Sequence, residues 1–159
     1  MLDTTEIALF AGLGLLFAVG LIVLAHWSKI RPARLAAFAL IAVSFIYVGF
    51  AIRAENPETW VGFEMTGVAV FATLAGMTII GSPWFVIAGL ALHPIWALYV
   101  HYRGAGSAFA PAPFAIANAS FDIAAALYIA FVFWKDQRAA KNTAPAPSGA
   151  ARGRKGAGK

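Results

Sequence analysis

The chain has 159 residues, of which 61% are apolar and only 12% are charged, and its mean hydropathy is +0.76. These values exclude an ordinary water-soluble domain and are typical of a protein that lies within a membrane. The sequence contains no cysteine, which excludes disulfide bonds, thiolate metal sites and a cysteine nucleophile.

Five hydrophobic runs are each long enough to cross a membrane. A hydrocarbon core about 30 Å thick needs about 20 mostly apolar residues in a helix. The expected spans are residues 7–25, 35–52, 61–80, 84–100 and 114–134. Because backbone polar groups in lipid must bond within their own segment, helices are favoured over open strands. The sequence therefore predicts an all-α fold, a polytopic membrane bundle of five transmembrane helices that forms one domain over residues 1–136.

The first span is expected to stay in the protein as an anchor. A secretory signal peptide begins with positive residues, whereas Asp3 and Glu6 precede this span.

The distribution of positive charge predicts the orientation of the bundle. Lysine and arginine in short loops resist translocation and mark the cytoplasmic side. Ten of the twelve lysines and arginines lie between spans one and two or after span five, and only Arg53 and Arg103 fall on the opposite side. We therefore expect the N-terminus outside and the C-terminus inside the cell.

Residues 137–159 are rich in alanine, proline, glycine and lysine and offer little to pack into a core. We predict a disordered, basic cytoplasmic tail that contacts anionic lipid. Because membrane topology already accounts for the net charge of +5, we expect no nucleic-acid partner.

Two ionisable residues lie near the middle of consecutive spans. Ionisable groups at membrane depth are costly and usually face a bundle interior or a watery cavity. With a rise of about 1.5 Å per residue, His93 lies within roughly 2 Å of the centre of span four, and Asp122 lies roughly 3 Å to the outer side of the centre of span five. These spans are antiparallel neighbours, so we predict that His93 and Asp122 are in contact and titrate as a coupled pair.

A second acid and histidine form a second candidate pair nearer the outer surface. Glu64 is roughly 10 Å and His101 roughly 13 Å outward of the centres of their spans. Asn118 lies one helical turn outward of Asp122 on the same face, and Tyr47 is also on the outer side of its helix. The strongly polar side chains within the spans are thus central or outward. This asymmetry predicts a polar cavity open to the outside and closed toward the cytoplasm.

Residues 89–104 (GLALHPIWALYVHYRG) and the following AFAPAPFAIANASFDIAAALYIAF resemble a family of small bacterial membrane proteins, domain of unknown function 6010. The matching features are His93 with Trp96, His101 with Tyr102 and Gly104, the pair Phe121 and Asp122, and Trp60 with Glu64. Ala97 and Val100 depart from the family pattern, which has an aspartate and a further histidine in this region. The resemblance covers roughly spans two to five. It implies a bacterial inner-membrane protein and adds Trp96 to the candidate site residues, but it implies no activity.

Several chemistries are not expected from these residues. His93 and His101 are eight residues apart, about 12 Å along one helix axis, and cannot share a metal ion. His26 lies at the wrong end of span one for a bis-histidine haem. The sequence contains neither a phosphate-binding loop nor a nucleophile elbow. We therefore predict no metal site and leave the cofactor unknown.

Three functions fit the polar residues. The first is a bundle that binds or transports a small molecule or protons, because membrane proton relays use Asp, Glu and His. The second is a structural or accessory subunit whose polar residues fix helix packing. The third is a small membrane enzyme that acts on a lipidic substrate with a histidine general base. Expected partners are the lipid bilayer, a small-molecule or lipid ligand, and a second copy of the chain.

Overall fold

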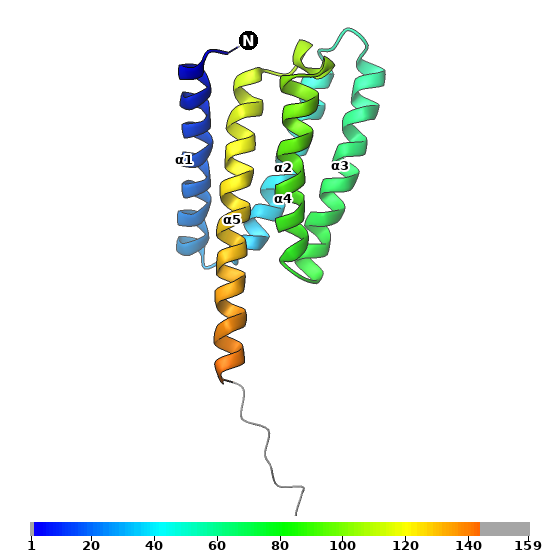
Figure 1. Cartoon of the computed structure of the whole chain (residues 1–159). Coiled ribbons are helices and arrows are strands. Elements are labelled where there is room, and N and C mark those ends of the chain that lie inside the picture. Colours follow the sequence, from blue (N-terminus) through cyan, green and yellow to red (C-terminus); the bar gives the residue numbers. More distant parts are fainter. Residues whose placement is uncertain (1, 144–159) are drawn as a thin grey trace, which may run out of the picture.

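The computed structural model describes residues 2–143 and is built from helices. The five long helices are α1 (Thr4–Ser28), α2 (Pro32–Ala51), α3 (Pro57–Ile80), α4 (Trp84–Trp96) and α5 (Ala112–Thr143), and they form an up-and-down bundle (Figure 1). A π-helical segment, η1 (Ala97–Tyr102), extends α4, and a 3-10 turn, η2 (Ala105–Ala108), lies in the loop before α5. The all-α fold and the five expected helices are confirmed.

All five helices, with η1 counted as part of the fourth, are long and apolar enough to cross a membrane. Large apolar side chains cover their outer surface: Phe17 on α1, Phe45 on α2 and Leu127 on α5 are each at least half exposed. Such a surface would associate in water but is stable against lipid. The chain therefore has the character of a multi-pass membrane protein.

Local sequence signals define where the helices begin and end. Asp3 caps α1, because its side chain accepts a hydrogen bond from the Glu6 backbone N–H at 2.8 Å and the Glu6 carboxylate accepts one from the Asp3 N–H at 2.9 Å. Lys29, with φ of 58°, ends α1 in the left-handed conformation. Pro32 and Pro57 occupy the first turns of α2 and α3, where a missing N–H costs nothing.

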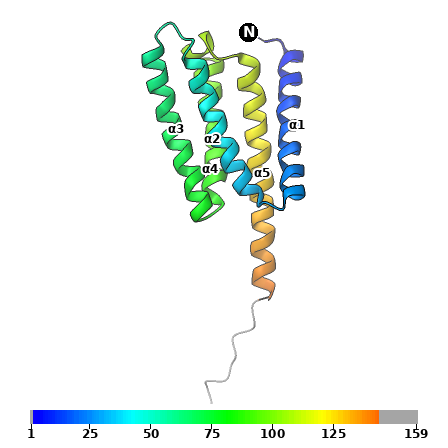
Figure 2. The same ribbon diagram turned by 180° about the vertical axis from the view of Figure 1, so that it is seen from behind.

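Helices α2 to α5 pack against one another in chain order, and only α1 departs from that order. Helix α1 lies mainly against α5, α2 lies against α3, and α4 lies between α3 and α5 (Figures 1 and 2). Gly14 allows the close approach of α1 and α5, since a Cβ there would overlap the Ala117 carbonyl. The Ser120 hydroxyl donates to the Ala11 carbonyl at 2.8 Å at the same contact. These contacts leave α1 at the edge of the bundle.

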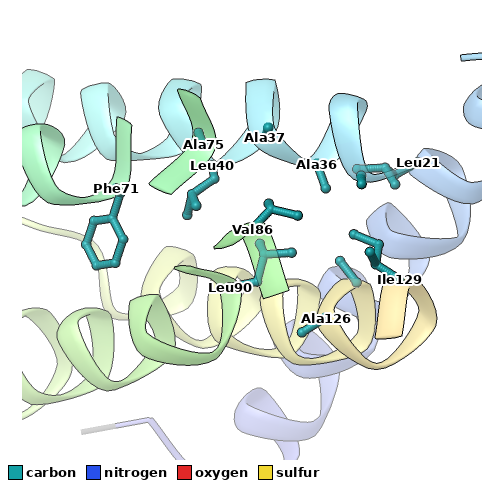
Figure 3. Close-up of a cluster of buried hydrophobic side chains, with 12 residues drawn as sticks. Leu21, Ala36, Ala37, Leu40, Phe71, Ala75, Val86, Leu90, Ala126 and Ile129 are labelled. Atoms are coloured by element: carbon teal, nitrogen blue, oxygen red, sulfur yellow. The ribbon is translucent and has the colours of Figure 1, made fainter. Parts of the chain in front are cut away.

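The interior has an apolar half and a polar half. We call the end at which α1 begins the N-terminal end and the opposite one the Arg31 end. Toward the Arg31 end, Leu40, Val86 and Leu90 are fully buried in an apolar core (Figure 3). Apart from Thr78, whose hydroxyl bonds to the Leu74 carbonyl of its own helix, the buried polar side chains lie at mid-bundle or in the other half, as the sequence asymmetry indicated.

Helix α5 is longer than the sequence indicated. It continues to Thr143, past residue 136, where the disordered tail was expected to begin. Alanines 139 and 140 favour the helix, and the Arg138 guanidinium lies 3.5 Å from the ring centroid of Trp134. The expectation of disorder is therefore wrong for residues 137–143, and the rest of the tail lies outside the described residues.

Candidate functional site

All seven candidate residues from the sequence lie together in the half of the bundle near the N-terminal end. We call this set the polar cluster. Its members are Tyr47 on α2, Glu64 on α3, His93 and Trp96 on α4, His101 on η1, and Asn118 and Asp122 on α5. All except the partly exposed Trp96 are buried. Four membrane helices thus each contribute to one polar interior.

The first part of the cluster is the expected pair with an added amide. His93 Nδ1 lies 2.8 Å from Asp122 Oδ2, and the two side chains are 1% and 0% exposed. Asn118 Nδ2 donates to Asp122 Oδ2 at 2.9 Å and also lies 3.1 Å from His93 Nδ1. Because a neutral imidazole nitrogen has a single lone pair, Asp122 Oδ2 is the acceptor that this amide serves in the pair. The predicted contact between His93 and Asp122 is present.

The second part joins Glu64 to His101 and Trp96. His101 Nε2 lies 3.4 Å from Glu64 Oε1, yet the two atoms are not aligned for a hydrogen bond and neither has a partner. The Trp96 indole N–H donates a long hydrogen bond, 3.5 Å, to Glu64 Oε2. The sequence predicts a depth near the outer surface for Glu64 and His101, and the structure buries both side chains between the helices.

Tyr47 packs against both histidines. Its ring stacks on His101 with a centroid distance of 4.1 Å and an interplanar angle of 13°. It also meets His93 edge-on at 5.9 Å. Phe71 lies edge-on against His93 at 4.6 Å. Tyr47 is therefore the residue that connects the two acid–histidine pairs.

The π-helical turn explains how both histidines of α4 and η1 reach the same interior. In an α-helix of about 3.6 residues per turn, residues eight apart differ in direction by about 80°. A π turn contains one extra residue, so eight residues that include it rotate the chain as much as seven residues of a regular α-helix. His101 therefore points within about 20° of the direction of His93. Pro94, which lacks the N–H needed to continue the α-helical ladder, lies three residues before the start of the segment.

Two glycines allow neighbouring groups to close over the cluster. The Trp96 ring lies against Gly67 of α3, where a Cβ would come within 3.1 Å of it. Gly106 in η2 lies so close to His101 that a Cβ would be 2.6 Å from its Nδ1. Aromatic rings cover the same end: Phe109 meets His101 edge-on at 6.0 Å, and Phe114 meets Tyr47 at 5.4 Å. These covering residues were not predicted from the sequence.

The packing of the cluster leaves polar atoms without partners. Within residues 2–143, five buried side-chain atoms have no hydrogen-bond partner: Tyr47 Oη, Glu64 Oε1, His101 Nδ1, His101 Nε2 and Asp122 Oδ1. Buried polar atoms are nearly always paired, and each unpaired one costs about 1–3 kcal/mol. All five belong to the polar cluster. This concentration of unpaired atoms in one place makes the polar cluster the candidate functional site.

The outward-open polar cavity that the sequence indicated is not formed at this cluster. The internal space bordered by Ser44, Tyr47, Glu64 and His93 has no volume for a water molecule. The π turn, η2 and the aromatic rings fill and cover the region instead. Within the described chain, no group of three or more His, Asp or Glu side chains converges closely enough to hold a metal ion.

Comparisons with known proteins add no identification. No family model matches the chain, and neither a curated protein nor a solved structure matches it. The resemblance to domain of unknown function 6010 therefore stays an expectation from the sequence, and the polar cluster is the basis for assigning a function.

Proposed function

We propose that this protein is a membrane-embedded bundle that binds protons and couples their binding to the binding or transport of a small molecule. The observation that supports this proposal best is the burial of five titratable side chains, those of Tyr47, Glu64, His93, His101 and Asp122, in one contact network with unpaired atoms. Ionisable groups are rare at membrane depth and generally serve proton or substrate pathways.

The geometry suits transfer of a proton within each acid–histidine pair. Between His93 and Asp122, the 2.8 Å contact allows the proton to lie on either Nδ1 or Oδ2, and Asn118 donates to the same Asp122 oxygen. His101 and Glu64 form a second such pair, whose 3.4 Å contact needs only a small rotation to align. The Tyr47 ring contacts both histidines, and its hydroxyl is a donor and acceptor without a partner in the cluster.

The apolar core limits how far a proton can travel. Leu40, Val86 and Leu90 fill the bundle between the cluster and the Arg31 end. A proton that enters from the N-terminal end therefore stops near mid-membrane. This arrangement fits a carrier or receptor whose conformation depends on protonation better than it fits an open proton channel. The π turn after Pro94 is the segment on which such a change would act.

A difference titration of the full-length protein in detergent tests this proposal. Aspartates and glutamates with ordinary pKa values near 4 stay ionised between pH 5 and 9, so few other groups take up protons in this range. We expect Glu64→Gln/Asp122→Asn to bind about two fewer protons than the wild type, one for each coupled pair. Thr73→Ala is the matched control, because the Thr73 hydroxyl bonds only to the Ala69 carbonyl of its own helix. Equal proton uptake by the double variant and the wild type would overturn the proposal.

A structural or accessory role is the second candidate, and the filled cluster favours it. With no volume for a water molecule beside Tyr47 and Glu64, the polar residues could serve only to fix helix register. In that case the two pairs keep one protonation state, and the same titration shows no difference between pH 5 and 9. The unpaired atoms count against this role, because polar residues that only hold helices together gain from being fully paired.

A further inference from the structure

A large apolar groove lies beside the polar cluster, between α1, α2 and α5. Its volume is about 580 Å³, and Leu13, Val43 and Phe121 are among the side chains that line it, one from each helix. Leu13 and Ile46 on its walls are each 41% exposed. The groove therefore opens on the surface of the bundle that faces lipid. The groove exists because α1 packs on α5 and makes few contacts with α2.

One polar side chain reaches this groove. Asn118 is the only residue with a polar side chain among those that line it, and none of them is charged. Asn118 is 5% exposed, and its Nδ2 lies within hydrogen-bond distance of Asp122 and His93. No described residue donates to Asn118 Oδ1. The amide group thus separates the polar cluster from the groove and offers the groove an acceptor.

We propose that the groove binds a neutral lipid-like molecule, a long apolar chain with a single hydroxyl group that donates to Asn118 Oδ1. The chain fits because the walls are apolar and the volume lies within the range of about 300–1,000 Å³ typical of ligand pockets. The molecule is neutral, since a charge would be left unpaired in this lining. The polar group is a donor, because an amide oxygen only accepts. Such a molecule reaches the groove by diffusing sideways through the bilayer.

This ligand site goes beyond the proposed proton binding and does not depend on it. The effect of a bound ligand on the polar cluster does rest on the proposed proton binding. The ligand hydroxyl would contact the Asn118 amide, which also bonds to Asp122 of the His93–Asp122 pair. Occupancy of the groove would then favour one proton position over the other. The binding and the proton uptake are measured separately, so each can fail alone.

Photolabelling of the full-length protein in lipid bilayers tests the site. The probes are hexadecanol with a photoreactive group on its chain and the methyl ether of the same compound, which lacks the donor. We expect the alcohol to label the groove segments of α1, α2 and α5 about 2- to 10-fold more than the ether, the range for one hydrogen bond. Ala42→Phe, which fills the groove from α2, should remove most of this labelling.

Ala69→Phe provides the matched control, because Ala69 is an exposed alanine on α3 that does not line the groove. It should leave the labelling unchanged, and both variants should elute from size exclusion like the wild type. Equal labelling by alcohol and ether would overturn the proposal and leave a groove that holds only a lipid chain. Labelling that Ala42→Phe does not reduce would overturn it as well, because the probe would then bind elsewhere.

Discussion

The contact between His93 and Asp122 predicts strong non-additivity in a double-mutant cycle. The single changes are His93→Ala and Asp122→Asn, and the third variant carries both. Each single change removes a partner from a pair that is 1% and 0% exposed, and breaking a buried pair in this way costs about 3–5 kcal/mol. In the double variant no charged group is left alone, so its loss should fall clearly below the sum of the single losses.

The expected coupling can be bounded from the contacts. Residues in one buried network show interaction energies of about 0.5–3 kcal/mol. Here the 2.8 Å contact and the bond from Asn118 to Asp122 indicate a value in the upper part of that range. The assay is unfolding of the purified protein in mixed micelles, followed by circular dichroism for all three variants and the wild type.

Ser120 provides a control cycle on the same helix. Its hydroxyl bonds to the Ala11 carbonyl of α1 rather than to the cluster. Ser120→Ala combined with His93→Ala should therefore be additive within about 0.5 kcal/mol. Additive losses for His93→Ala with Asp122→Asn would refute the reasoning, because two groups in direct buried contact cannot be independent.

Three further predictions follow from the fold. Gly106→Ala should destabilise the protein by about 1–3 kcal/mol, because the added Cβ would lie 2.6 Å from His101 Nδ1. Thermal unfolding measures this loss, with Gly49→Ala as the control because a Cβ at Gly49 meets open space. Equal stability of the two variants would contradict the prediction. Truncation after Thr143 should leave the unfolding temperature nearly unchanged, since the five packed helices remain; a loss of several degrees would show that the tail docks. Reporter fusions near residue 107 and at residue 159 should lie outside and inside the cell, respectively, as the positive charges indicate. A cytoplasmic signal at residue 107 would contradict the predicted topology.

The spans and the first acid–histidine pair could be predicted from the sequence because simple physics determines them. Long uncharged runs have no stable alternative to membrane helices. The helical rise then gives the depth of His93 and Asp122, and the short loops of a five-span bundle make their helices antiparallel. The capping by Asp3 and Glu6 explains why α1 begins at Thr4, three residues before the apolar run at residue 7.

The sequence indicates Glu64 and His101 as a second candidate pair, but the burial of that pair and the groove depend on features that no periodicity reveals. A regular helix would direct His101 away from His93, and only the π turn after Pro94 brings it inward. The burial of His101 also needs η2, which closes over it at Gly106. The groove reflects the pairing of α1 with α5 rather than with α2. Each of these follows from packing between distant segments.

Residue-resolved protonation within the bilayer is the most direct test of the central claim, that the polar cluster binds protons inside the membrane. Infrared difference spectra of the reconstituted protein, recorded between pH 5 and 9, report carboxyl and imidazole bands together. The wild type should show bands that change with pH and that disappear in part with Asp122→Asn and in part with Glu64→Gln. If the wild type and both variants give the same spectra over this range, the buried pairs do not exchange protons and the account is contradicted.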